Sequence, residues 1–313
     1  MNFTKPLLAV TISTLFLSCS INKLVINRVS DSLTGDGQNK VFMEDDDPEL
    51  VGDALPFAIK MYETLLANNP DHQGLMLTTG SLFIMYANAF VQGPAETLSA
   101  ADYYKKRAQI ERAGRLYRRG AALIESALEK KFPGWKDSRD DPEKLAVFLA
   151  KTEKEDIPLL YWNAAGVLSA YALNPFNLDL GMRVPELRAL IDRAYELDPD
   201  YNLGTLDEFY LLFYASLPAG MGGDMEKAEF HYKKALEKSK GLSAAPYVSY
   251  AKSVAVPAQD YERFKFCLEN ALAIDVEKES ANRLVNIVSQ RKARYLLDNA
   301  GDFFAELDFT DEE

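Results

Sequence analysis

The 313 residues of this chain include 47 acidic and 35 basic side chains, a net charge of −12, and 48% of the residues are hydrophobic. This charge balance argues against binding to phosphate backbones and against electrostatic adsorption to anionic lipid, so we expect no nucleic-acid partner. The hydrophobic content allows a large buried core, in one elongated domain or in two compact ones.

The N-terminus has the pattern of a secretory signal. Lys5 precedes an uncharged run that ends at Ser18, and this run is too short to span a bilayer comfortably. The run leads into Cys19 through the sequence FLSC, which resembles a bacterial lipobox with larger residues than usual at its first two positions. We predict a signal peptide over residues 1–18 and a lipid on the Cys19 thiol; the alternative is an ordinary signal peptide that contains Cys19 by chance. Cleavage would leave only Cys267, so the fold needs no internal disulfide.

A polar segment separates this anchor from the body. Residues 30–40 are rich in turn formers, and we predict a lipid-anchored tether over residues 19–46. Asp47 then provides a helix cap, with proline and glutamate directly after it, as helix starts prefer. Beyond this point, apolar residues recur at helical spacing and no alternating strand pattern of useful length is found.

The predicted helices recur in pairs. Ala194, Ala235 and Ala271 occupy equivalent small positions, 41 and 36 residues apart. Prolines or polar breaks follow the second helix of a pair, which resembles the tetratricopeptide pattern. The spacing is irregular and a long insertion spans residues 131–155. We therefore predict an all-α fold, a degenerate tetratricopeptide-like superhelix over residues 47–300, followed by an acidic tail over residues 301–313.

Three long runs carry no charge, at residues 74–93, 157–178 and 209–223. Polar residues and prolines interrupt or bound them, so we expect core burial and not membrane insertion. If the inner helices are apolar on both faces, the concave side of the superhelix should be apolar and aromatic, and should hold an apolar ligand or a partner segment. The alternative is that these side chains fill a tightly wound interior. The candidate lining residues are Tyr86, Phe90, Trp162, Tyr171, Phe213, Tyr247 and Tyr250.

The last long helix, predicted over residues 282–298, has an arginine on its apolar stripe. Arg291 lies one turn from Ile287, and Arg294 follows it. A buried arginine needs an anionic partner. That partner is either an acidic group of the fold or a carboxylate on a ligand.

No catalytic constellation is recognisable. The two histidines, His72 and His231, lack metal-ligand spacing, and Cys267 lies on an apolar stripe where it is expected to pack. The sequence GMGGD at residues 220–224 lacks the lysine and the spacing of a phosphate loop. We predict a protein without enzymatic activity, cofactor or metal.

Long blocks of the chain resemble the T component associated with TRAP transporters, a family of exported bacterial lipoproteins. The likeness is carried, in order, by residues 20–35, 41–75, 217–241, 246–275 and 282–299. The resemblance implies a periplasmic, lipid-anchored helical protein that is a partner of the solute-binding component of a TRAP system. It also implies a homotrimer with a pore through each protomer, and it provides no catalytic residues.

Two functions follow from the residues and the resemblance together. The first is a transport accessory that docks the solute-binding component and binds or relays a hydrophobic ligand, with Arg291 meeting a carboxylate if the ligand is an organic acid. The second is a lipid-anchored scaffold for envelope assembly that takes no small ligand.

Overall fold

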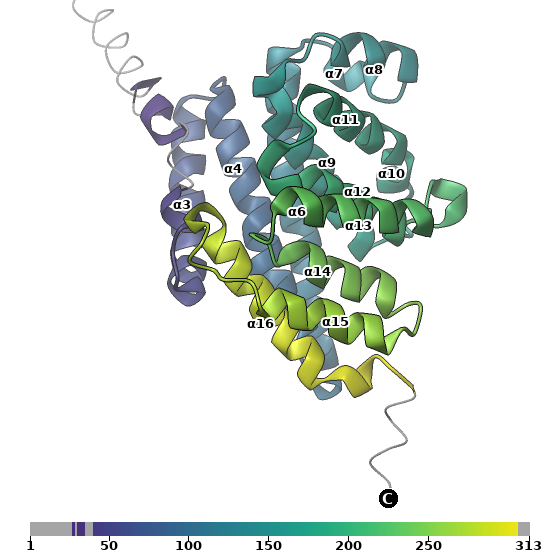
Figure 1. Cartoon of the computed structure of the whole chain (residues 1–313). Coiled ribbons are helices and arrows are strands. Elements are labelled where there is room, and N and C mark those ends of the chain that lie inside the picture. Colours follow the sequence, from purple (N-terminus) through teal and green to yellow (C-terminus); the bar gives the residue numbers. More distant parts are fainter. Residues whose placement is uncertain (1–26, 29, 35–39, 306–313) are drawn as a thin grey trace, which may run out of the picture.

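The computed structural model describes residues 27–28, 30–34 and 40–305 (Figure 1). These residues form helices and no strand, which confirms the all-α prediction. The long helices are α3 (Pro48–Asn68), α4 (Gln73–Tyr86), α6 (Tyr103–Lys131), α9 (Ile157–Leu173), α11 (Val184–Leu197), α12 (Thr205–Ser216), α13 (Met225–Ser239), α15 (Tyr261–Leu272) and α16 (Arg283–Asp298). The shorter α-helices are α2 (Lys40–Met43), α5 (Gly93–Glu96), α7 (Trp135–Ser138), α8 (Pro142–Leu149), α10 (Leu178–Met182) and α14 (Ala245–Tyr250).

Two segments are π-helical, η1 (Ala87–Gln92) after α4 and η6 (Ala251–Ala255) after α14. Each extends the preceding helix without a break in the helical backbone. The 3₁₀ turns are η2 (Ala100–Asp102), η3 (Lys154–Asp156), η4 (Tyr201–Gly204), η5 (Ala219–Met221), η7 (Ser280–Asn282) and η8 (Ala300–Asp302).

Helix α3 begins as the sequence predicts. The Asp47 side chain accepts a hydrogen bond from the backbone N–H of Leu50 at 3.0 Å, and Pro48 and Glu49 occupy the first turn. This satisfies one of the free N–H groups at the helix start and places negative charge at the positive end of the helix dipole.

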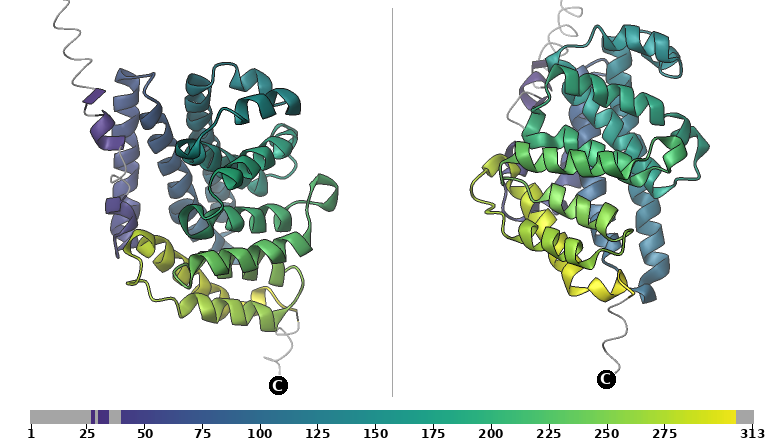
Figure 2. Two further views of the ribbon diagram at one scale, coloured as in Figure 1. Left: turned by 45° about the horizontal axis from the view of Figure 1, so that its top comes forward. Right: turned by 45° about the vertical axis from the view of Figure 1, so that its right-hand side comes forward.

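Neighbouring helices pack side by side and form one continuous stack (Figures 1 and 2). Helix α4 packs between α3 and α6, α6 packs on α9, and α9 on α11, while α12 pairs with α13 and α14 with α15. The stack curves, so that α16 returns to contact α2 and α3. Ala194, Ala235 and Ala271 are fully buried on α11, α13 and α15, where small side chains permit close packing. The assignment of these pairs to tetratricopeptide repeats stays a prediction.

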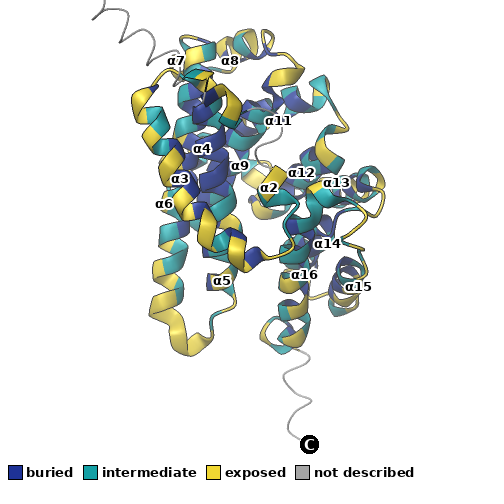
Figure 3. Cartoon of the chain, turned by 90° about the vertical axis from the view of Figure 1, so that its left-hand side faces the viewer, coloured by how far each residue is buried: buried dark blue, intermediate teal, exposed yellow. Residues whose placement is uncertain are grey.

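The long helical parts of the uncharged runs form the interior, whereas the end of the second run is exposed, with Phe176 at 92% and Leu178 at 80%. The continuous helical stretch Gln73–Glu96 is long and apolar enough to cross a membrane, yet most of it is buried inside the protein. Figure 3 shows α4 and α9 largely in the buried colour, behind the exposed outer side of α3. Core burial of these helices, expected from the sequence, is thereby confirmed.

Part of the segment predicted to be a turn-rich tether is helical in the structure. Residues 30–34 and 40–43 are helical. The Tyr62 hydroxyl donates to the carbonyl of Leu33 at 2.9 Å, and His72 Nε2 lies 3.0 Å from the Asp31 carboxylate. The polar composition of residues 30–40 predicts turns, but residues 30–34 form a helix that packs against α3 and the start of α4. The predicted signal peptide, Cys19 and residues 306–313 of the acidic tail lie outside the described residues.

Helices α4 and α6 cross at two glycines. A Cβ atom on Gly120 would lie 2.5 Å from the carbonyl oxygen of Gly80, and one on Gly80 would lie 2.7 Å from that of Gly120. The backbones can therefore meet only if both positions lack a side chain.

We expect Gly120→Ala to lower the free energy of unfolding by about 1–3 kcal/mol, because its methyl group collides with the α4 backbone. Gly114→Ala on the same helix is the matched control. A Cβ there meets nothing within 4 Å, so we expect a gain of up to about 1 kcal/mol from helix propensity. Urea unfolding measures both changes, and equal stability of the two variants would contradict the close crossing.

Candidate functional site

The predicted aromatic lining is divided between buried and partly buried positions. Phe213 and Tyr250 are 1% and 4% exposed and pack inside the protein. Tyr250 stacks on Tyr232 with ring centroids 4.1 Å apart, and Phe213 stacks on Phe209 at 6.1 Å. Phe213 and Tyr250 therefore fill the interior, as the alternative prediction has it.

Tyr171 is buried as well, at 4% exposed, whereas Tyr86, Phe90, Trp162 and Tyr247 are partly buried against core residues. Phe90 packs over Gly52, and Trp162 contacts Tyr161 edge-to-face at 5.2 Å. Two cavities in the described part of the chain, of about 160 and 220 Å³, are lined by none of the predicted aromatic or arginine residues. Tyr171 therefore fills the interior, and the predicted ligand role stays a prediction for Tyr86, Phe90, Trp162 and Tyr247.

The placement of Arg291 corrects the sequence analysis. Its side chain is 52% exposed and forms a two-pronged ion pair with Glu49 of α3, so it neither lines a groove nor lies in the core. Arg294 is exposed as well. The buried face of α16 includes Ser289 and Ala293, which are too small or too polar to register in a hydrophobic pattern. The apparent apolar stripe was therefore rotated relative to the real one, and the expected acidic partner of the fold is Glu49.

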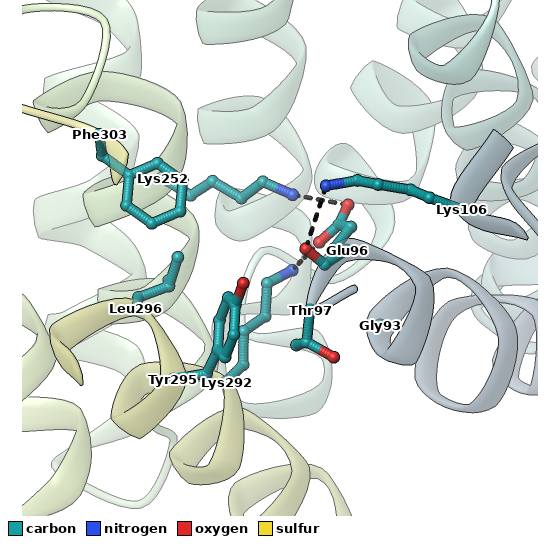
Figure 4. Close-up of a pocket in the computed structure, with 9 residues that line it drawn as sticks. All are labelled: Gly93, Glu96, Thr97, Lys106, Lys252, Lys292, Tyr295, Leu296 and Phe303. Atoms are coloured by element: carbon teal, nitrogen blue, oxygen red, sulfur yellow. Dashed lines mark hydrogen bonds and ion pairs between the residues drawn. The ribbon is translucent and has the colours of Figure 1, made fainter. Parts of the chain in front are cut away.

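A cleft with a charged centre lies where the two ends of the stack meet (Figure 4). Its volume is about 160 Å³. The residues that line it come from α5, α6, η6, α16 and the segments that follow α5 and η8. They are Gly93, Glu96, Thr97, Lys106, Lys252, Lys292, Tyr295, Leu296 and Phe303.

Glu96 is held at the centre by two lysines. Lys252 Nζ lies 2.6 Å from Glu96 Oε1, and Lys292 Nζ lies 3.1 Å from Glu96 Oε2. Lys106 Nζ donates to the backbone carbonyl of Glu96 at 3.4 Å. Burial alone would raise the pKa of Glu96, but the charges of Lys292 and Lys252 and their hydrogen bonding hold it at about 2. The carboxylate is ionised at neutral pH.

A second layer fixes the Glu96 side chain. Gln92 Nε2 donates to Glu96 Oε1 at 2.8 Å, and the hydroxyl of the buried Tyr117 donates to Gln92 Oε1 at 2.7 Å. Gln92 is the last residue of η1 and Lys252 lies within η6. Two side chains that contact Glu96 therefore come from π-helical segments. Such segments occur often at functional sites, where one extra residue in a turn redirects the side chains that follow.

The cleft has positive charge in excess. Among its described lining residues, three ammonium groups face one carboxylate. Burial lowers the pKa of Lys252, and repulsion by Lys292 lowers it further. An added anion would relieve this repulsion. Tyr295, Leu296 and Phe303 form an apolar wall beside the charges (Figure 4). The arrangement suits an organic anion with a small apolar group.

The second cavity, of about 220 Å³, has the opposite balance. It is lined by Lys131 together with Glu155 and Asp156, and Lys131 Nζ lies 2.6 Å from Asp156 Oδ1. Its positive charge is already neutralised, so the cavity offers no comparable site for an anion.

The other reactive side chains are occupied structurally. Cys267 is fully buried with its sulfur 3.3 Å from the Tyr232 hydroxyl, and burial raises the pKa of its thiol, so it packs as expected. His231 Nδ1 lies 2.7 Å from the buried Asp207, which Lys238 also contacts at 2.6 Å. Across the ranges that the structure describes, no cluster of three His, Cys, Asp or Glu side chains could hold a metal ion.

Sequence reasoning missed the lysine cleft because its parts are far apart in the chain. Lys106, Lys252 and Lys292 show no common spacing, and lysines on helices are usually solvated. The only local hints are the small residues before Glu96 in the sequence GPAE, and these do not identify a site.

Comparison with known proteins identifies a family and a relative that each match most of the chain. The model of the family described as TRAP transporter T-component matches residues 44–304. An uncharacterized protein of Treponema pallidum (strain Nichols) is 34% identical over 302 residues, which covers 92% of this chain and 94% of that protein.

We expect Glu96→Gln to lower the free energy of unfolding at pH 7 by about 1–3 kcal/mol, because Lys252 and Lys292 would repel each other without a counter-charge. This is less than for a fully buried pair, since the lysines are about one-third exposed. Folding lowers the pKa of Glu96, so its stabilisation is present above about pH 4.5 and is lost as pH falls towards 2.

The difference between wild type and Glu96→Gln should therefore shrink between about pH 5 and pH 3 in urea unfolding. The control is Glu269→Gln, whose exposed pair with Lys265 at 3.9 Å should contribute less than about 0.5 kcal/mol. A difference that does not vary with pH would show that Glu96 acts through packing and not through charge.

Proposed function

Because the chain belongs to the TRAP transporter T-component family, we propose that it docks the solute-binding component of such a transporter and binds a small organic acid in the lysine cleft. The family supports an accessory role in transport. The ligand and the docking are the proposal.

The excess of lysines in the cleft is the observation that carries the ligand proposal. A carboxylate would accept charge-assisted hydrogen bonds from Lys106 or Lys292, while its apolar part lies against Tyr295 and Phe303. Apolar cavities of about 150 Å³ hold a molecule the size of benzene, so a volume of about 160 Å³ limits the apolar part to a ring or a short chain. In this proposal a lysine of the cleft binds the carboxylate, and Arg291 does not.

Lipid attachment at Cys19 and a periplasmic location complete the proposal. The described residues 27–28 and 30–34 contact α3 and the start of α4, so only a short stretch of chain would separate the body from the bilayer. A chain of net charge −12 gains no attraction from anionic lipid, and the acyl groups would supply the membrane affinity. The trimer and the pore through each protomer are what the family resemblance implies.

Ligand binding is tested by titrating phenylacetate and hexanoate into the protein in a calorimeter. We expect Lys292→Gln to weaken binding of the better ligand about ten- to a hundredfold, the usual effect of losing one charge-assisted hydrogen bond. The matched control is Arg294→Gln, an exposed cation on the same helix outside the cleft, which should leave the affinity unchanged.

A loss of affinity in Arg294→Gln but not in Lys292→Gln would move the site to the outer face of α16. No binding of either acid, with docking of the solute-binding component retained, would favour the scaffold function.

The anchor is tested by labelling cells with radioactive palmitate. We expect wild type to incorporate the label and to sediment with membranes, and Cys19→Ala to do neither, because the thiol is the predicted attachment point. Cys267→Ala is the control and should label like wild type, since its thiol is buried. Equal labelling of wild type and Cys19→Ala would remove the anchor from the proposal.

A further inference from the structure

Positive charge is concentrated on the first half of α6, in a chain that is acidic as a whole. Residues 103–119 contain seven basic side chains and a single acidic one, Glu111. The basic residues are Lys105, Lys106, Arg107, Arg112, Arg115, Arg118 and Arg119. This local excess opposes a net charge of −12 for the chain.

Helix stability does not account for this arrangement. The first turn of α6 has no acidic residue, and Lys105 and Arg107 lie near the positive end of the helix dipole. Arg112, Arg115 and Arg119 follow one another at spacings of three and four, and each such like-charged pair costs about 0.2–0.5 kcal/mol. Arg112 and Arg119 contact Tyr86 and Glu63 within the fold. Lys105, Arg115 and Arg118 are therefore the cations that indicate a role outside it.

Several of these cations are free to meet a partner. Arg107 pairs with Glu111 and Arg119 with Glu63, but no acidic side chain in the described ranges pairs with Lys105, Arg115 or Arg118. Tyr104, at the start of the helix, is 85% exposed. Arginine and tyrosine together are typical of the centres of protein interfaces. We define the α6 basic face as Tyr104, Arg107, Arg115 and Arg118, which helical spacing places on one side of α6.

We propose that the α6 basic face is the surface that receives an acidic patch on the solute-binding component, which rests on the docking proposed above. A protein fits better than a membrane. Residues 27–28 and 30–34 lie at one end of the long helices, and the first turns of α6 lie at the other (Figures 1 and 3). A bilayer reached through the N-terminus would face the far end. Complementary charge would speed association and orient the two proteins.

The test compares two charge reversals of equal size. Arg115→Glu/Arg118→Glu reverses the α6 basic face. Lys136→Glu/Lys144→Glu reverses two exposed lysines on α7 and α8, at the opposite end of the molecule (Figure 1). Binding to the purified solute-binding component of the same TRAP system is measured by biolayer interferometry at about 50 and 300 mM salt. Circular dichroism checks that both variants fold.

At low salt we expect Arg115→Glu/Arg118→Glu to weaken binding at least about tenfold, and Lys136→Glu/Lys144→Glu to change it less than about twofold. Higher salt should weaken wild-type binding and leave the α6 variant less affected. Equal affinities for the two variants would overturn this inference and leave docking intact. No binding by wild type would overturn both.

Vesicles containing about 30% phosphatidylglycerol serve as a second probe. We expect no binding of the full-length protein stripped of lipid. Vesicle binding that is lost in Arg115→Glu/Arg118→Glu, with protein binding unchanged, would assign the face to a membrane and overturn the proposal.

Discussion

The pairing of Glu96 with Lys252 and Lys292 joins the two ends of the helical stack. It joins α5, near the start of the stack, to η6 and α16 near its end, across the whole sequence of paired helices. The ion pair between Arg291 and Glu49 closes the same junction from outside. A curved stack of helices can open or tighten with little change at each packing contact, so cross-links between its ends fix the curvature.

The cleft lies at the same junction, where the charged side chains around Glu96 meet an apolar wall. Two π-helical segments deliver Gln92 and Lys252 towards Glu96, and α16 contributes both a lysine and the apolar wall. An ion pair in a half-buried place is a weak source of stability, but an excess of ammonium groups in that place is a means of binding an anion. The lysines that pair with Glu96 are therefore also the residues proposed to bind the anion.

Lys106 connects the cleft with the α6 basic face. It lines the cleft from the first turns of α6, whose outer side carries the unpaired arginines. An anion in the cleft and an acidic protein on α6 would experience one positive field, although the rest of the chain is acidic. If both bind, each alters the affinity of the other by the same factor.

The all-α class, the cap at Asp47, the buried uncharged helices and the packed Cys267 followed from local patterns, because periodicity and charge are properties of neighbouring residues. Local patterns failed where small side chains such as Ser289 and Ala293 formed the buried face, which misplaced Arg291. They also failed for residues 30–34, which pack as helix although their composition favours turns. The lysine cleft depended entirely on tertiary structure. Its charged residues lie up to 196 positions apart, and only the curvature of the stack brings the three lysines within hydrogen-bond distance of Glu96.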